Sequence, residues 1–229
     1  MNKKYELTSE TKVIYGHTLH RIIALRDFGG IKKGDLGGWI EKEENLSHEG
    51  GCWVSDNGCV TGNGRVYGNG HVSGNACVSG NGRVYGNGCV FGNGCVTENG
   101  CVYDNGCVSG NGYVYGHGRV YGNGCVSDNG CVYGNGCVSG NGCVSGNAQI
   151  TGNGLVTRDD DYAIVSGFGT EHRTTTFFRC EDGRVRVRCG CFYGTIDEFR
   201  KQAKKTREGQ IVKDYLLIAD LMEDHFKNS

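Results

Sequence analysis

An aliphatic residue recurs at every sixth position through the middle of the chain, from Val54 to Val156, in 18 consecutive six-residue units without an insertion. Between successive aliphatic residues, counting the first of them as position one, the third is mostly Gly, the fourth is Asn except at His117, and the fifth is Gly or Ala. A period of six does not fit collagen, which repeats every three residues, or silk-like strands, which repeat every two. The pattern predicts a repeat protein with a regular fold, although the chain holds 42 Gly and no Pro.

The spacing also predicts the local structure. A piece such as Arg65-Val66-Tyr67 is a short strand whose Val points inward while its neighbours point outward. The following Gly-Asn-Gly turns the chain, because Gly and Asn tolerate positive φ. One Val in six residues buries too little surface for a unit to fold alone, so we expect the units to stack. The Asn residues would then align as a ladder of side-chain amides.

This pattern resembles the hexapeptide-repeat family of left-handed β-helices, in which three units form one triangular coil of 18 residues. The resemblance covers residues 52–157 and implies about six coils; the left hand comes from the resemblance alone. We therefore expect a mainly β fold, a left-handed parallel β-helix with a cap at each end.

The flanking segments differ in composition from the repeat. Residues 1–51 are predicted to form an N-terminal β cap, with strands over 12–15 and 18–25 joined by a turn at Tyr15-Gly16-His17. Residues 158–229 are predicted to form a small α+β domain, with strands over 162–165, 174–179 and 184–189. Thr195 with Glu198 three positions later is typical of a helix start. A second helix is predicted from one apolar face: Ile211, Tyr215, Ile218, Met222 and Phe226.

The N-terminal segment and residues 189–199 (CGCFYGTIDEF) are similar to those of uncharacterised hexapeptide-repeat proteins of phages, prophages and some bacterial genomes. That resemblance implies a mobile-element origin and supplies no activity.

If residues 18 apart stack, one face of the rod has a distinctive composition. It carries all three Arg of the repeat and a column of four Tyr: Arg65, Arg83, Arg119, Tyr67, Tyr85, Tyr103 and Tyr121. Guanidinium groups beside aromatic rings suit a phosphate-bearing ligand such as a nucleotide. The same residues suit a self-association interface, or a Tyr column that simply stabilises the strands. The sequence leaves these three interpretations open.

The family resemblance suggests acyl transfer as a possible activity. In such an enzyme, the resemblance implies a catalytic His and an acyl-donor pocket between the subunits of a trimer, usually beside a loop that leaves the coils. This repeat has no such loop, and His71 and His117 have no partner in sequence that would orient them. We therefore assign no catalytic residue. The Cys residues that recur every 18 positions would point in parallel, which suits neither disulfides nor tetrahedral zinc. No metal and no cofactor is expected.

Composition limits the classes of partner and the cellular location that we expect. The formal net charge is −1, which gives no general attraction to nucleic acid or to an anionic membrane. No apolar stretch approaches the roughly 20 residues of a membrane helix, and the first ten residues lack a secretory core. We expect a cytoplasmic protein whose 14 Cys are mostly reduced. The function that we predict is non-enzymatic: a structural or binding protein that self-associates, as a homotrimer, and binds a partner. The alternatives are a binder of a nucleotide-like anion and an acyl-CoA-dependent acyltransferase.

Overall fold

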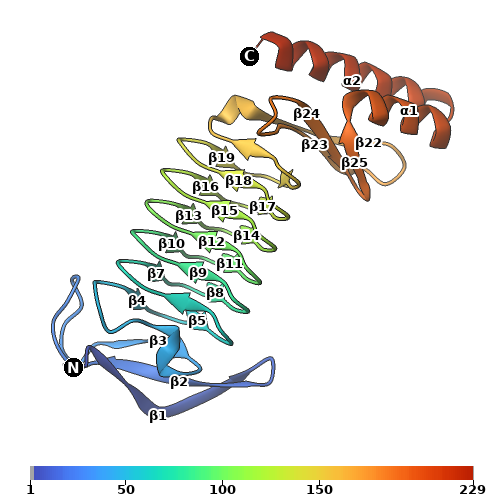
Figure 1. Ribbon diagram of the computed structural model, residues 1–229. Helices are drawn as coiled ribbons and strands as arrows, with labels where there is room; N and C mark the ends of the chain where they lie inside the picture. The colour runs from blue at the N-terminus through green and yellow to red at the C-terminus, as the bar shows by residue number, and fades with distance from the viewer. Residues whose placement is uncertain (1–2, 229) are drawn as a thin grey trace.

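The repeat forms a three-sided rod of stacked coils, seen in the computed structural model of residues 3–228 (Figure 1). Each side of the rod is a parallel sheet of two-residue strands. The first side contains β4 (Trp53–Val54), β7 (His71–Val72), β10 (Cys89–Val90), β13 (Cys107–Val108), β16 (Cys125–Val126) and β19 (Cys143–Val144). The second contains β5 (Cys59–Val60), β8 (Cys77–Val78), β11 (Cys95–Val96), β14 (Tyr113–Val114), β17 (Cys131–Val132) and β20 (Gln149–Ile150). The third contains β6 (Arg65–Val66), β9 (Arg83–Val84), β12 (Cys101–Val102), β15 (Arg119–Val120), β18 (Cys137–Val138) and β21 (Leu155–Val156).

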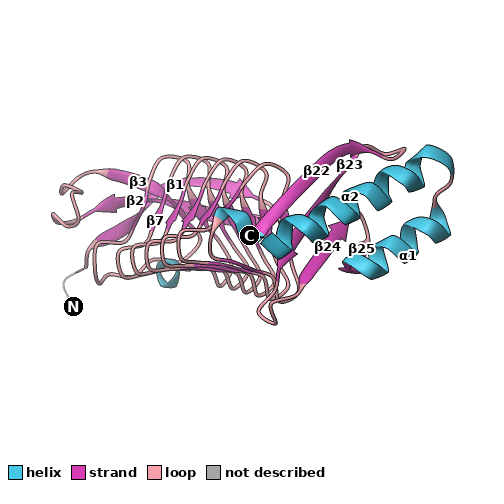
Figure 2. Ribbon diagram, turned by 90° about the horizontal axis from the view of Figure 1, so that it is seen from above, coloured by secondary structure: helices cyan, strands magenta, loops and turns pink. Residues whose placement is uncertain are grey.

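The expected parallel β-helix is confirmed, with residues 18 apart in register on neighbouring coils. Cys101 pairs with Arg83 on one side and with Arg119 on the other, for example. The aliphatic first-position residues fill the interior, and each is at most 1% exposed. Figure 2 shows the coils aligned along the rod. Since no single unit has a core of its own, the stacked aliphatic column is what holds the rod together.

The turns correct one detail of the prediction. Positive φ falls on the third position, as at Gly62 (φ 60°) and Asp104 (φ 53°), and not on the Asn that follows. The Asn side chains instead form the expected amide ladders at the corners, with Nδ2 of Asn57 donating to Oδ1 of Asn75 at 3.2 Å. The fifth position is tight: a Cβ on Gly106 would lie 2.5 Å from the carbonyl oxygen of Val120 on the next coil. This closeness favours Gly and excludes larger side chains, although Ala occurs at positions 76 and 148.

The N-terminal cap adds more to the rod than the repeat predicts. A hairpin of β1 (Tyr5–Ile14) and β2 (His17–Ala24) turns at Tyr15-Gly16, as expected, and is followed by β3 (Leu36–Ile40). Strand β3 pairs in parallel with β5, and Leu46, just after the short 3-10 helix η1 (Glu43–Asn45), bridges to Val66. The cap therefore supplies about one further coil, for a total of about seven. The expected six covered the six-residue repeats alone.

The C-terminal segment forms a four-stranded antiparallel sheet and two helices beyond the last coil (Figure 1). After the 3-10 helix η2 (Asp159–Asp161) come β22 (Tyr162–Phe168), β23 (Arg173–Arg179), β24 (Val185–Cys189), β25 (Phe192–Thr195), α1 (Ile196–Thr206) and α2 (Gly209–Asn228). Thr195 caps α1, accepting from the backbone N–H of Glu198 as expected. Strand β25 is the one strand here that the sequence analysis missed.

Two consecutive residues on β23 explain how this domain sits on the rod. Side chains alternate across a strand, so Phe178 packs into the core of the coils while Phe177 packs against the helices. The sheet therefore lies between the last coil and the helix pair, and covers the open end of the rod. Among the described residues, neither helix is both long and apolar enough to cross a membrane.

Candidate functional site

The three Arg of the repeat lie at the sixth position of their units, on the outside of the sheet formed by β6, β9, β12, β15, β18 and β21. We call the outer surface of this sheet the Arg/Tyr face. Arg65 and Arg83 are direct neighbours on β6 and β9, whereas Cys101 separates Arg83 from Arg119. All three Arg are exposed. The small Cys101 therefore leaves a gap in the row, with one guanidinium group on each side.

The four Tyr of this face form a continuous stack. The ring centroids of Tyr67, Tyr85, Tyr103 and Tyr121 are 4.8, 5.0 and 4.9 Å apart, and successive planes differ by 8° or less. Partial burial and the neighbouring Tyr hydroxyls raise the pKa of Tyr103 to about 12, although Arg119 opposes the shift. Because each inner ring is covered on both faces, no base can stack between them. The ladder stabilises neighbouring coils, and any ligand meets mainly ring edges.

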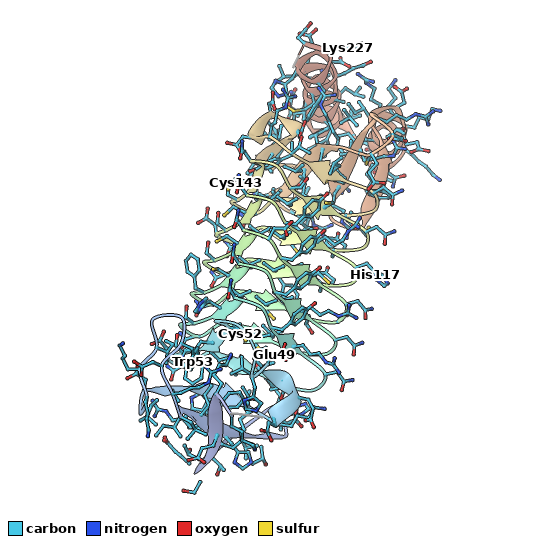
Figure 3. All side chains as sticks on the ribbon, turned by 60° about the vertical axis from the view of Figure 1, so that its left-hand side comes forward. Glu49, Cys52, Trp53, His117, Cys143 and Lys227 are labelled. Carbon is cyan, nitrogen blue, oxygen red and sulfur yellow. The ribbon has the colours of Figure 1, made fainter. Side chains whose placement is uncertain are left out.

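A groove runs along one corner of the Arg/Tyr face. It encloses about 690 Å³ and is lined by Arg83, Asn99, Cys101, His117, Arg119, Asn135, Asn153 and Glu181. We call it the corner groove. His117 stands at the corner and projects from the edge of the rod (Figure 3). The groove therefore brings together two of the predicted Arg with a His that the sequence analysis had set aside.

His117 interrupts the Asn ladder of its corner. Asn81 donates to Asn99 at 3.2 Å, and Asn135 donates to Asn153 at 3.5 Å, but within the described part of the chain no amide bond links Asn99 to Asn135. The backbone is unaffected, since the N–H of His117 still donates to the carbonyl of Gly134 at 2.7 Å. The imidazole of His117 therefore lies between the side-chain amides of Asn99 and Asn135, and all three side chains line the groove.

The electrostatics of the corner groove favour an anion at its centre. Burial raises the pKa of the Cys101 thiol, while the positive charges of Arg83 and Arg119 act in the opposite direction. The positive charges of Arg83 and Arg119 therefore both act at the position of the Cys101 thiol. Glu181 is the acidic member of the lining, and its backbone N–H is bonded to the carbonyl of Asn153 at 3.0 Å. A ligand would thus lie between the two Arg, away from Glu181.

Two of the remaining predicted residues, Arg65 and Tyr67, line a second hollow. Arg65, Tyr67 and Arg83 line a space of about 490 Å³ with Glu44, Ser47 and Val66. Here the N-terminal cap brings Glu44 next to the cations, which makes this hollow less suited to an anion. Tyr85, Tyr103 and Tyr121 lie in neither hollow.

The side chains that could support catalysis or metal binding are dispersed. His71 is half-buried, and burial lowers its pKa. Neither His71 nor His117 has a hydrogen-bonded orienting group among the residues described, and no three His, Cys, Asp or Glu side chains there are placed to hold a metal ion. The Cys columns are free thiols.

One signal for the corner groove was present in the sequence. His117 precedes Arg119 by two positions, and the fourth and sixth positions of one unit border the same corner. Treating His117 only as a substitute for Asn hid this proximity.

Comparison with known proteins gives little further guidance. No protein-family model matches the chain. A 42-residue segment, 18% of the chain, is 43% identical to part of an uncharacterized acetyltransferase, YdcK, of Escherichia coli (strain K12). The match covers 13% of the length of that protein, so the likeness concerns a short stretch of sequence and not the whole molecule.

Proposed function

We propose that this protein is a non-enzymatic binding protein that holds a small phosphate-bearing anion in the corner groove. The observation that carries the proposal is that Arg83 and Arg119 flank the small Cys101, with His117 at the adjacent corner. The strand spacing places the two Arg backbones about 10 Å apart, so that both side chains can reach one anion above Cys101.

The chemistry of the lining suits a phosphate group. Guanidinium groups present forked donors that match two phosphate oxygens at once. The side-chain amide of Asn99 provides a further donor, whereas that of Asn135 donates to Asn153, and His117 adds a ring nitrogen. Exposed charges are screened by water and salt, so we expect modest affinity that falls as ionic strength rises.

Thermal shift and calorimetric titration of the full chain with pyrophosphate, ADP, ATP, coenzyme A and acetyl-coenzyme A will test the proposal. We expect at least one of these compounds to stabilise the protein at low salt. Replacing Arg83 or Arg119 with Gln should lower the affinity about tenfold or more, because a charge-assisted hydrogen bond contributes about 1.5–3 kcal/mol.

Two matched variants distinguish the site from general charge effects. Lys201→Gln removes an exposed positive charge on α1 and should leave binding unchanged. Arg65→Gln tests the second hollow, and if it weakens binding as much as Arg119→Gln does, the ligand is not confined to the corner groove. Turnover of acetyl-coenzyme A would contradict the non-enzymatic proposal and favour the acyltransferase suggested by the short match to YdcK.

Self-association is a second candidate role, favoured by the tip of the N-terminal hairpin. Val13 and Tyr15 are 70% and 95% exposed, and the adjacent hollow of about 870 Å³ is lined by Tyr15, Cys77, Cys95 and Tyr113 among others. An apolar tip beside a partly apolar hollow is typical of an interface between copies. Light scattering should give the mass of a trimer that Val13→Ser with Tyr15→Ser reduces, and a monomeric wild type would exclude this role.

A further inference from the structure

Lys4 and Cys52 meet where the N-terminal cap joins the first coil of the repeat. Both residues are fully buried, and Nζ of Lys4 lies 3.1 Å from Sγ of Cys52. The same Nζ donates to the carbonyl oxygen of Cys52 at 2.8 Å and approaches that of Glu49 at 3.5 Å. Cys52 and Glu49 lie together at this end of the rod in Figure 3. The contact therefore fixes a nitrogen next to a sulfur inside the protein.

Burial disfavours the charged form of the Lys4 amine. Phe28 covers the amine, with the ring centroid 4.8 Å from Nζ, and within residues 3–228 no carboxylate forms an ion pair with it. Burial lowers the pKa of Lys4; interaction with Cys52 opposes this shift, and the nearby Arg26 adds to it. Attack on sulfur requires the neutral amine, which has a lone pair, and a lowered pKa makes this form more accessible than in an exposed Lys.

We propose that Lys4 and Cys52 form an oxidative modification site, in which hydrogen peroxide links Nζ to Sγ through a covalent S–N bond. In the first step, Sγ of the Cys52 thiol attacks one peroxide oxygen, the O–O bond breaks, water leaves and a sulfenic acid forms. In the second step, the lone pair of Nζ attacks Sγ, the S–O bond breaks, and the departing hydroxide takes a proton from Nζ as water. Sulfur loses two electrons and peroxide gains them.

The position of the pair gives the bond a structural consequence. Strand β1, which Lys4 precedes, is the outermost strand of its sheet, and local opening of such an edge admits a small oxidant. Once formed, the bond would tie residue 4 to residue 52 and hold the cap over the first coil. A covalent link of this kind restricts the unfolded chain, so the oxidised protein should melt at a higher temperature than the reduced protein.

Peptide mapping of the full chain after mild peroxide treatment tests the proposal. The expected product is a linked pair of peptides that contains Lys4 and Cys52, lighter by about 2 Da than the sum of the two and separated by dithiothreitol. Whole-protein mass does not suffice, because a disulfide between two of the other thiols changes the mass equally. Blocking of tryptic cleavage after Lys4 gives a second signature.

Variants make the outcome specific. Cys52→Ala and Lys4→Met should each abolish the linked pair, whereas Cys180→Ala, which removes another buried thiol, should leave it intact. Cys52 that stays unmodified, that carries two or three oxygens, or that joins a different residue would overturn the proposal, and wild-type mapping alone can reveal each of these results. A linked pair that retains an oxygen would exclude the direct S–N bond.

Discussion

Arg83 and Arg119 are both in register with the same intervening residue, Cys101, which lies between them on the neighbouring strand of each. The size of that middle side chain sets the depth of the corner groove. Had Arg or Tyr continued the column at this position, the space between the two guanidinium groups would be filled.

Cys101→Phe should therefore block ligand binding while both Arg remain. A ring at this position would fill the groove floor and separate the two cations, so we expect the thermal shift by the ligand to be lost. The control is Cys89→Phe on β10, which adds the same ring to a different side of the rod and should leave the shift unchanged. Equal losses in the two variants would point to a general defect in stacking.

His117→Asn should stabilise the protein and weaken ligand binding. The new amide can accept from Asn99 and donate to Asn135, which completes the ladder at that corner. Each of the two added hydrogen bonds contributes about 0.5–1.5 kcal/mol, so the melting temperature without ligand should rise. Removing the imidazole from the groove should at the same time lower the affinity for the anion severalfold. A variant that is more stable and binds equally well would show that His117 plays no part in binding.

Much of this fold could be predicted because one physical requirement repeats along the sequence. Val66 and Val84 are unable to bury themselves except by stacking, and the three units per coil that the resemblance to hexapeptide-repeat proteins implies set the coil at 18 residues, as their pairing confirms. The Arg and Tyr columns follow from that number alone. The additional coil formed by the cap was not predicted, because Trp39 pairs with Cys59, 20 positions away, and no six-residue pattern marks that coil.

The corner groove was only partly predictable. Arg83 and Arg119 were assigned to one face from their spacing, but Glu181 joins the lining from the C-terminal domain, which no local pattern reveals. The contact of Lys4 with Cys52 is also invisible in the sequence, since it depends on how the cap folds back over residues 43–52.

Asp104 and Glu98 should respond in opposite directions to replacement by Gly. Both have positive φ, 53° and 54°, a conformation that Gly adopts with less strain. Glu98 offsets the strain by accepting from the N–H of Gly116 at 2.9 Å, whereas among residues 3–228 Asp104 has no such bond. Asp104→Gly should raise the free energy of unfolding by up to about 1 kcal/mol, and Glu98→Gly should leave it unchanged or lower. Chemical denaturation will compare the two variants. Destabilisation of both by the same amount would refute this explanation.

The junction between the last coil and the C-terminal domain depends on Asp161, which is 5% exposed. Its Oδ2 accepts from the N–H and the hydroxyl of Thr157, both at 2.7 Å, and from the N–H of Arg158 at 3.0 Å. Burial alone would raise the pKa of Asp161, but the bonds from Thr157 and Arg158 outweigh it and hold the pKa below its usual value of 3.8.

Acidification should therefore weaken this junction. A carboxyl group whose pKa is lowered by folding stabilises the folded state above its unfolded pKa, and the contribution disappears as the pH falls through the folded pKa. Asp161→Asn should reduce stability at pH 7 by about 1–3 kcal/mol, because an amide replaces one acceptor oxygen with a donor. The difference in melting temperature between wild type and variant should shrink below about pH 4. A difference that stays constant from pH 7 to pH 3 would mean that the charge of Asp161 does not hold the junction.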